Sequence, residues 1–245
     1  MKPRDVGRYI MRKLSKNKIR LILIVILCYT SISGYAQNYE MQANQNKIDF
    51  NFRDNENIVS EFIKFEKDIA KIKIIAKIEN DSIIAVYVLN STKDTLNLST
   101  QDSQLYLIQE AKDIDGIWKP IEYWNYSWCG NSYGSENLSS DKIIKTNCKK
   151  YSGKFTTEIR IRLLAGNESF YSNSIICNID SCQFKITEKF KKHYTYKNAL
   201  RVSDEKLAEK VMFLIPGAKE EYREKDKIWK SWITEQNRKR NMNKK

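Results

Sequence analysis

The densest group of side chains that could do chemistry is a set of aromatic rings between residues 118 and 133. Its members are Trp118, Tyr123, Trp124, Tyr126, Trp128 and Tyr133. Exposed aromatic rings offer flat apolar platforms on which sugar rings or peptide side chains pack. The same rings could instead fill the space between two sheets, where buried tryptophan is common. The group therefore predicts either a hydrophobic core or a ligand platform formed by Trp118, Trp124, Tyr126 and Trp128.

Four carboxylic acids near these rings could supply the acid and the base of glycoside cleavage. They are Asp113, Asp115, Glu122 and Glu136. A pair of such groups flanks the scissile bond in most glycosidases, but acids in polar turns usually face water or cap the turn itself. The sequence has no glycine-rich phosphate loop, serine-centred elbow or EF-hand pattern. We therefore expect no catalytic residues and no bound cofactor.

Cys129 lies in a Trp-Cys-Gly sequence and could act as a nucleophile if a base stood beside it. The single histidine of the chain, His193, lies in the charged stretch 191–194. Such a stretch is typical of a solvated surface, so cysteine catalysis is disfavoured.

The N-terminal sequence has the three parts of a secretory signal peptide. Residues 1–20 hold eight basic side chains and one acid, residues 21–27 are apolar, and small residues stand at Gly34 and Ala36. The apolar run is shorter than the ~20 residues that cross a bilayer. We predict cleavage after Ala36, which removes residues 1–36 and exports the chain to the periplasm, the outer membrane or the extracellular space. An uncleaved membrane anchor is the alternative.

Four cysteines follow this leader, and an even number in an exported chain indicates disulfides. We predict the pairs Cys129–Cys148 and Cys177–Cys182, because each closes a short loop. A metal site is disfavoured, since the chain has no Cys-x-x-Cys or His-x-x-His pair.

The formal net charge of +13 is unevenly distributed. Residues 37–185 hold 18 basic and 20 acidic side chains, whereas residues 186–245 hold 17 basic and 9 acidic ones. The excess of positive charge after the leader therefore belongs to the C-terminal part. This argues against nucleic acid as the partner of the main domain and favours a basic appendage.

A series of short strands is predicted within residues 67–190, most of them from alternating apolar and polar residues, and 83–89 from a continuous apolar run rich in β-branched residues. The expected strands are 71–78, 83–89, 95–98, 104–111, 117–124, 155–164, 170–179 and 183–186. Pro120 places its strand at a sheet edge, and residues 129–152 are expected to form a loop. Short strands at this spacing are typical of an Ig-like antiparallel β-sandwich. Residues 37–66 before it, polar and rich in asparagine, predict a flexible arm that could add one edge strand.

The period changes in residues 191–245, which predict a basic helical tail. Ser203 is a good N-cap for a helix that ends near Pro216, and a second helix is expected over 219–238. We expect the tail to dock on the sandwich through its apolar side chains. These are Leu207 and Val211 in the first helix, and Trp229 and Trp232 in the narrow apolar stripe of the second. The alternative is that the stripe faces a partner or an anionic envelope surface.

Parts of the chain resemble known groups. The leader end Gly34-Tyr35-Ala36-Gln37 resembles that of exported proteins of Bacteroidota. The stretch from Asn90 through Trp118 to Tyr133, followed by 151–155, is similar to uncharacterised secreted β-sandwich proteins of that phylum, a resemblance that implies no activity. The hairpin 115–118 is also similar to BsuPI-type proteinase inhibitors.

The sequence as a whole favours an exported, non-catalytic binding or structural module of the bacterial cell envelope. Its partner would be an envelope protein or glycan, with no nucleic acid and no transmembrane segment after cleavage. Two alternatives stay open: a carbohydrate-binding or carbohydrate-processing protein that uses residues 118–133, and a protease inhibitor that presents them as a loop.

Overall fold

The computed structural model describes residues 40–52 and 71–242. These residues belong to one compact unit, Glu40–Lys245. The predicted signal peptide lies outside the described residues, as does the 53–66 part of the predicted arm. No helix in the described ranges is both long enough and apolar enough to cross a membrane.

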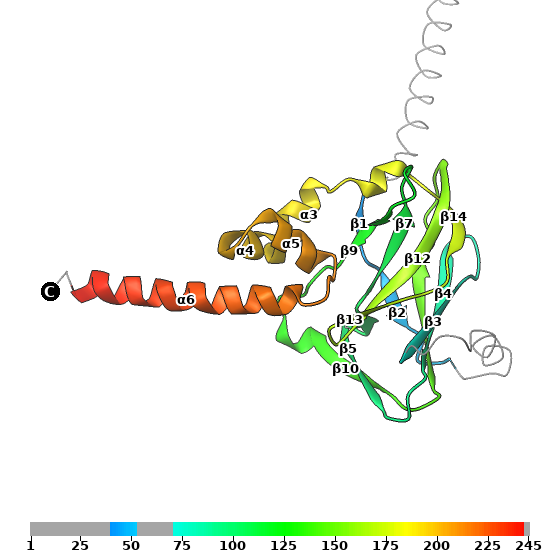
Figure 1. Cartoon of the computed structure of the whole chain (residues 1–245), viewed down its shortest axis with the longest axis horizontal. Helices are drawn as coiled ribbons and strands as arrows, with labels where there is room; N and C mark the ends of the chain where they lie inside the picture. The colour runs from blue at the N-terminus through cyan, green and yellow to red at the C-terminus, as the bar shows by residue number, and fades with distance from the viewer. Residues whose placement is uncertain (1–39, 53–70, 243–245) are drawn as a thin grey trace, which may run out of the picture. The chain divides into compact units, whose positions relative to one another are not determined.

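One large sheet contains four antiparallel strands in the order β2-β11-β4-β3 (Figure 1). These strands are Asn46–Ile48, Ile143–Lys149, Ile83–Asn90 and Ile72–Ile78. Strands β3 and β4 form a hairpin, as their sequence pattern predicts. The Oδ1 atom of Asn80 accepts the N–H of Ser82 at 2.8 Å and fixes the turn between them.

The second large sheet is built around β12 (Phe155–Ala165). Strand β7 (Leu107–Lys112) pairs with one side of β12, while β13 (Glu168–Tyr171) and β14 (Ile175–Ile179) pair with its other side. Pro120 lies in β8 (Trp118–Pro120), which pairs with β7 at the edge of this sheet, so the predicted edge position is confirmed.

Two small sheets complete the β part of the chain. One has the order β10-β5-β6 (Tyr133–Leu138, Leu96–Gln101 and Gln104–Leu105), and the other pairs β1 (Gln42–Ala43) with β9 (Glu122–Tyr123). The predicted loop over 129–152 is therefore wrong, since it contains β10 and β11. Strand β10 has no apolar alternation because most of its side chains are exposed, and pairing with β5 is what holds it.

The two large sheets enclose an aliphatic core, which we call the sandwich core. Strand β12 shows how the sequence builds it: Ile159, Ile161 and Leu163 point into the core, while Arg160 and Arg162 lie on the outer face. The prediction of a mainly β fold with antiparallel sheets and C-terminal helices is confirmed. The Asn173 side chain ties the two sheets together, because it hydrogen-bonds both the N–H and the carbonyl of Ala76 on β3, at 2.9 and 3.1 Å.

Residues 40–52 of the predicted N-terminal arm contain two short strands, β1 and β2. Strand β2 is an edge strand of the first sheet, which agrees with the prediction that the arm could add one. The Asn46 side chain is buried and bonds to both the N–H and the carbonyl of Leu105, and Asn44 bonds to Glu122. Polar composition does not loosen this segment, because its amides satisfy buried partners.

The C-terminal part contains four α-helices: α3 (Glu188–Lys192), α4 (Tyr194–Val202), α5 (Glu205–Met212) and α6 (Ala218–Met242). Helix α5 is capped by Asp204, whose Oδ1 accepts the N–H of Leu207 at 2.8 Å, rather than by the predicted Ser203. The predicted strand 183–186 is wrong, because Asp180 and Gln183 form a capping box that starts a 3-10 turn, Ser181–Phe184. Helices α3 and α4 were not predicted.

The predicted disulfides are also wrong, because Cys129, Cys148, Cys177 and Cys182 are all free thiols. Cys148 on β11 and Cys177 on β14 both point into the sandwich core and are buried there. Their predicted partners are partly exposed and lie outside the strands, Cys129 just before the 3-10 turn Gly130–Ser132 and Cys182 within the 3-10 turn Ser181–Phe184. The pairs were predicted from loop length alone. That criterion does not consider which face of a strand each cysteine occupies, and the Cys148 and Cys177 thiols both lie on the inward face.

Candidate functional site

A second core, which we call the aromatic–helical core, joins the helices to the β part of the chain. Its buried members are Met41, Tyr106, Ile108, Tyr123, Trp124, Tyr126, Phe190, Tyr196, Ala199, Leu207, Ala208, Val211, Met212, Leu214 and Ala218. Phe190 lies at its centre, with ring centroids 5.1 Å from Tyr123 and 5.2 Å from both Tyr196 and Phe213. Docking of the predicted tail by Leu207 and Val211 is therefore confirmed.

The structure distributes the aromatic residues of 118–133 between this core and the surface. Trp124 and Tyr126 are buried, and Trp124 stacks on Tyr106 with centroids 4.6 Å apart. Trp128 is 86% exposed, whereas Trp118 is half-buried against the Arg160 guanidinium. The core interpretation is thus correct for Tyr123, Trp124 and Tyr126. The four predicted platform residues do not form one surface.

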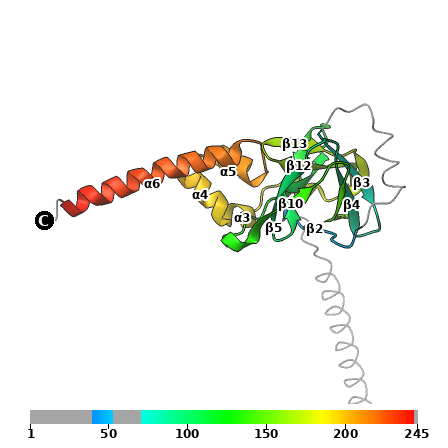
Figure 2. The ribbon, with the colours of Figure 1, turned by 90° about the horizontal axis from the view of Figure 1, so that it is seen from below.

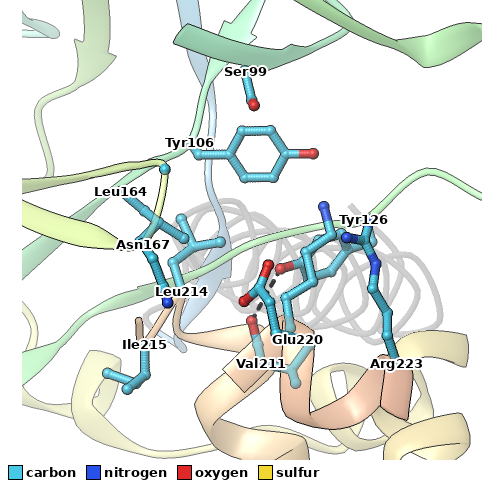
Figure 3. Close-up of a pocket in the computed structure, with 12 residues that line it drawn as sticks. Ser99, Tyr106, Tyr126, Leu164, Asn167, Val211, Leu214, Ile215, Glu220 and Arg223 are labelled. Atoms are coloured by element: carbon cyan, nitrogen blue, oxygen red, sulfur yellow. Dashed lines mark hydrogen bonds between the residues drawn. The ribbon is translucent and has the colours of Figure 1, made fainter. Parts of the chain in front are cut away.

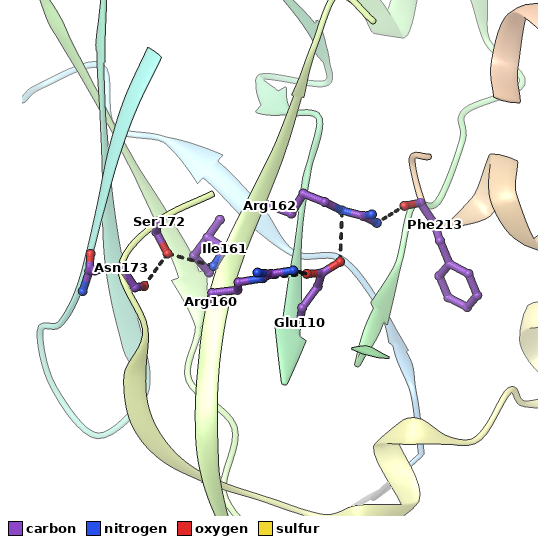
Figure 4. A network of polar contacts seen from close by, with 7 residues as sticks. All are labelled: Glu110, Arg160, Ile161, Arg162, Ser172, Asn173 and Phe213. Atoms are coloured by element: carbon purple, nitrogen blue, oxygen red, sulfur yellow. Dashed lines mark hydrogen bonds and ion pairs between the residues drawn. The ribbon is translucent and has the colours of Figure 1, made fainter. Parts of the chain in front are cut away.

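A polar anchor holds the helices on the outer face of the second large sheet (Figure 4). The buried carboxylate of Glu110 on β7 forms ion pairs with Arg160 at 2.7 Å and Arg162 at 3.2 Å. Arg162 also donates a hydrogen bond to the carbonyl of Phe213, just after α5. The chain between α5 and α6 is therefore fixed on the sheet by a charge-assisted contact.

Beside the aromatic–helical core lies a pocket of about 420 Å³, which we call the Lys219 pocket (Figure 3). This volume is in the range of sites for small ligands. Glu220 and Arg223 rise from α6 on one side, and Tyr106 and Ser99 face them from the other. The turn between β12 and β13, with Asn167, closes a further wall.

Lys219 lines this pocket, and its ammonium group lies over three tyrosine rings, two of which, Tyr106 and Tyr126, also line it. Its Nζ is 5.0 Å from the ring centroid of Tyr106, 5.5 Å from that of Tyr126 and 5.7 Å from that of Tyr133. Such contacts stabilise a cation that has left part of its water shell. Burial, and then the neighbouring charge of Arg223, lower the pKa of Lys219 below its ordinary value. The amine is thus held in place by ring faces.

Arg223 follows Lys219 by one helical turn, so the two cations share a face of α6. Neither forms a salt bridge with any residue that the structure describes. Most basic residues on the rest of α6 differ: Lys225, Lys230, Arg238 and Lys239 all pair with carboxylates. Two unpaired cations at one pocket can bind an anionic group.

The hydroxyl groups around the pocket are not available as bases. Burial raises the pKa of Tyr106 to about 12 and raises that of Tyr126 still further. Tyr126 donates its proton to the carbonyl of Val211 at 3.2 Å. The rings therefore act as neutral walls, while Leu164 and Leu214 add apolar surface. The pocket suits a small ligand that combines an apolar body with a negative group.

The predicted acidic residues do not assemble into a catalytic pair. Asp113 caps its own turn through the N–H groups of Asp115 and Ile117 and pairs with Lys119 at 2.5 Å. Glu122 is completely buried. Its two oxygens accept four hydrogen bonds, from Asn44, from the backbone and side chain of Gln109, and from Tyr151, at 2.7–2.9 Å. Burial raises the pKa of Glu122, which these donors oppose. The Glu122 carboxylate is therefore a buried structural group that cannot reach a substrate.

His193 has a structural role that the sequence did not reveal. Its Nδ1 atom accepts the N–H of Thr195 at 3.2 Å and caps helix α4, and burial lowers the pKa of the ring. The prediction of a solvated His193 is wrong, because the side chain is half-buried. Within the described ranges no cluster of histidine, cysteine and carboxylate side chains could hold a metal ion.

Comparisons with known proteins find no match, neither to a protein-family model nor to a curated protein. The site is therefore interpreted from its own geometry.

Sequence reasoning missed the pocket residues Lys219, Arg223 and Tyr106. One signal was present, because Lys219 and Arg223 lie four residues apart just after Pro216-Gly217, where a helix begins. Nothing in the pattern of residues 104–111 shows that Tyr106 faces that helix rather than water. Only the packing of the helices on the sheet brings the rings and the cations together.

Proposed function

We propose that this chain is an exported, non-catalytic binding module of the cell envelope, and that the Lys219 pocket is its ligand site. The observation that carries the proposal is the pair of unpaired cations, Lys219 and Arg223, beside a pocket with tyrosine walls. The ligand class is a small organic anion, such as a carboxylate or a phosphate ester, with an apolar or aromatic body.

Two features support binding rather than catalysis. The tyrosines have raised pKa values, and the histidine and the buried glutamate are occupied by structural hydrogen bonds. Among the described residues that line the pocket, Glu220 is the one carboxylate, and no histidine or cysteine lies beside it to complete a nucleophile–base pair. The export part of the proposal rests on the composition of residues 1–36.

The proposal can be tested with 8-anilinonaphthalene-1-sulfonate, a fluorescent anion that has aromatic rings. The chain should bind it, and the variants Lys219→Gln and Arg223→Gln should each weaken binding about tenfold, since a hydrogen bond to a charged group contributes roughly 1.5–3 kcal/mol. Fluorescence titration measures both affinities.

The matched control is Lys227→Gln, which removes the same charge from an exposed position of α6 that does not line the pocket. Its affinity for the dye should equal that of the natural chain. If all three variants bind the dye equally well, the pocket is not the site. Equal losses in all three would indicate general attraction to a basic helix and would also refute the proposal.

A further inference from the structure

The first half of α6 is held by its neighbours. Ala218 and Tyr222 pack on the aromatic–helical core. Arg201 of α4 forms an ion pair with Asp226 at 3.8 Å and lies 4.1 Å above the ring of Trp229. These contacts explain why the predicted docking of Trp229 is correct in part, since the ring covers an arginine rather than entering the core.

The second half of α6 extends past the other helices (Figure 2). From residue 230 onward, its polar contacts with described residues are all to residues three or four positions away on α6 itself. Residues 230–242 of α6 span about 20 Å at 1.5 Å per residue. A helix of this length is marginal in water without tertiary contacts. The predicted docking of Trp232 on the sandwich is accordingly wrong, because its side chain is 57% exposed.

Residues 227–242, which we call the outer half of α6, carry both exposed apolar side chains and an excess of basic ones. Ile228 is 70% exposed and lies one turn before Trp232 on the same face. Residues 227–242 carry five basic side chains and one acid. Lys239 falls on the same face as Ile228 and Trp232 by helical spacing, and Arg240 flanks it. An exposed tryptophan with basic residues around it suits the headgroup region of a lipid bilayer.

We propose that the outer half of α6, residues 227–242, binds the surface of an anionic lipid bilayer. Trp232 and Ile228 would enter the boundary between headgroups and acyl chains, and the basic side chains would contact lipid phosphates. The charge of the segment decides this choice of occupant, because a net charge of +4 next to an apolar face complements a negative surface. The apolar face is small, so binding requires anionic lipid and weakens in high salt.

Vesicle sedimentation tests the proposal with the chain from Gln37 to Lys245. This chain keeps the compact unit Glu40–Lys245 and lacks the apolar run at 21–27, which would enter lipid by itself. Vesicles of phosphatidylglycerol and phosphatidylcholine in equal amounts are compared with vesicles of phosphatidylcholine alone. We expect binding to the mixed vesicles only, lost when sodium chloride is raised to about 1 M, where the Debye length is about 3 Å.

Two variants with matched controls locate the contact. Trp232→Ala should weaken binding about tenfold, as expected for removing a large apolar side chain from a buried position. Trp128→Ala, which removes an even more exposed tryptophan elsewhere, should bind normally. The double variant Lys239→Gln/Arg240→Gln should weaken binding by more than tenfold, since each charge contributes about fivefold. The control Lys93→Gln/Lys154→Gln removes two exposed charges from the β part of the chain and should have no effect.

Circular dichroism should show that every variant keeps its fold, because all the substituted side chains are exposed. The proposal is overturned if the chain binds neither kind of vesicle, or if it binds both equally. It is also overturned if the control variants lose as much affinity as the α6 variants, since binding would then come from another surface.

Discussion

The two cores of this protein are built from different side chains and serve different purposes. The sandwich core consists almost entirely of isoleucine, leucine, valine and alanine from paired strands. The aromatic–helical core contains tyrosine, tryptophan and phenylalanine, and it joins a sheet to helices. Branched aliphatic side chains interlock between two regular surfaces. Large aromatic rings with polar ends fill the space between less regular surfaces, such as a sheet and a group of helices. Here they also form the walls of a pocket.

The proposed binding site belongs to the aromatic–helical core. Tyr106 and Tyr126 stabilise the contact between sheet and helices with one part of each ring and face Lys219 with another. Damage to the aromatic–helical core should therefore affect both stability and ligand binding, whereas damage to the sandwich core should act through stability alone.

The largest effect is expected at Phe190, which is fully buried among three other rings. Phe190→Ala should reduce the free energy of unfolding by about 4 kcal/mol, as large-to-small changes of buried rings do. Urea denaturation measures it. The control Leu200→Ala changes an exposed position of α4 and should stay within about 0.5 kcal/mol. A small loss at Phe190 would mean that the helices are only loosely attached.

A second prediction concerns Glu122, the polar group at the boundary between the two cores. Glu122→Gln should cost about 2–3 kcal/mol, because an amide NH₂ would replace an oxygen that accepts two hydrogen bonds and would face their donors. The control Glu168→Gln, at an exposed position, should leave the urea midpoint unchanged. If the two variants unfold alike, the buried network is not what stabilises this boundary.

A smaller effect is expected where α6 leaves the aromatic–helical core. Trp229→Ala should cost about 1 kcal/mol, because the half-buried ring loses its contact with Arg201. Trp232→Ala, three residues later, should stay within about 0.5 kcal/mol. Thermal melts of the two variants compare them directly, and equal losses would contradict the different burial of the two rings.

The smallest effect is a pH dependence of ligand binding. The pKa of Lys219 is lowered from its ordinary value of 10.5, so its ammonium group loses the proton at a lower pH than an exposed lysine does. Affinity for an anion should therefore fall by about fivefold as pH rises through this lowered pKa, while Arg223 stays charged. Dye titrations at several alkaline pH values would show the step. It should be absent in Lys219→Gln and present in Lys227→Gln.

The sequence predicted the sandwich well because strand alternation records directly which face is buried. Strands β3 and β12 follow from that pattern, whereas β4, which is buried on both faces, follows from a continuous apolar run. The prediction from sequence failed for β10, because this strand is held by pairing with β5 and has no apolar alternation. It also failed for the disulfides, because the strand face on which a cysteine lies decides which thiols can meet. The aromatic rings of 118–133 were recognised, but whether each enters a core depends on helices that the pattern of 186–202 did not reveal. The pocket needs that same packing, so it could not be predicted from spacing alone.

The most direct test of the Lys219 pocket compares two ligands that differ only in charge. 1-Naphthoate and 1-naphthamide have the same ring system, and isothermal titration calorimetry gives the affinity of each. The natural chain should bind the carboxylate at least about tenfold more tightly than the amide, because only the carboxylate carries a negative charge that can form ion pairs with Lys219 and Arg223. The variant Lys219→Gln/Arg223→Gln should bind both ligands equally. If the natural chain does not distinguish the two ligands, or the double variant still prefers the carboxylate, the pocket does not bind anions through these residues.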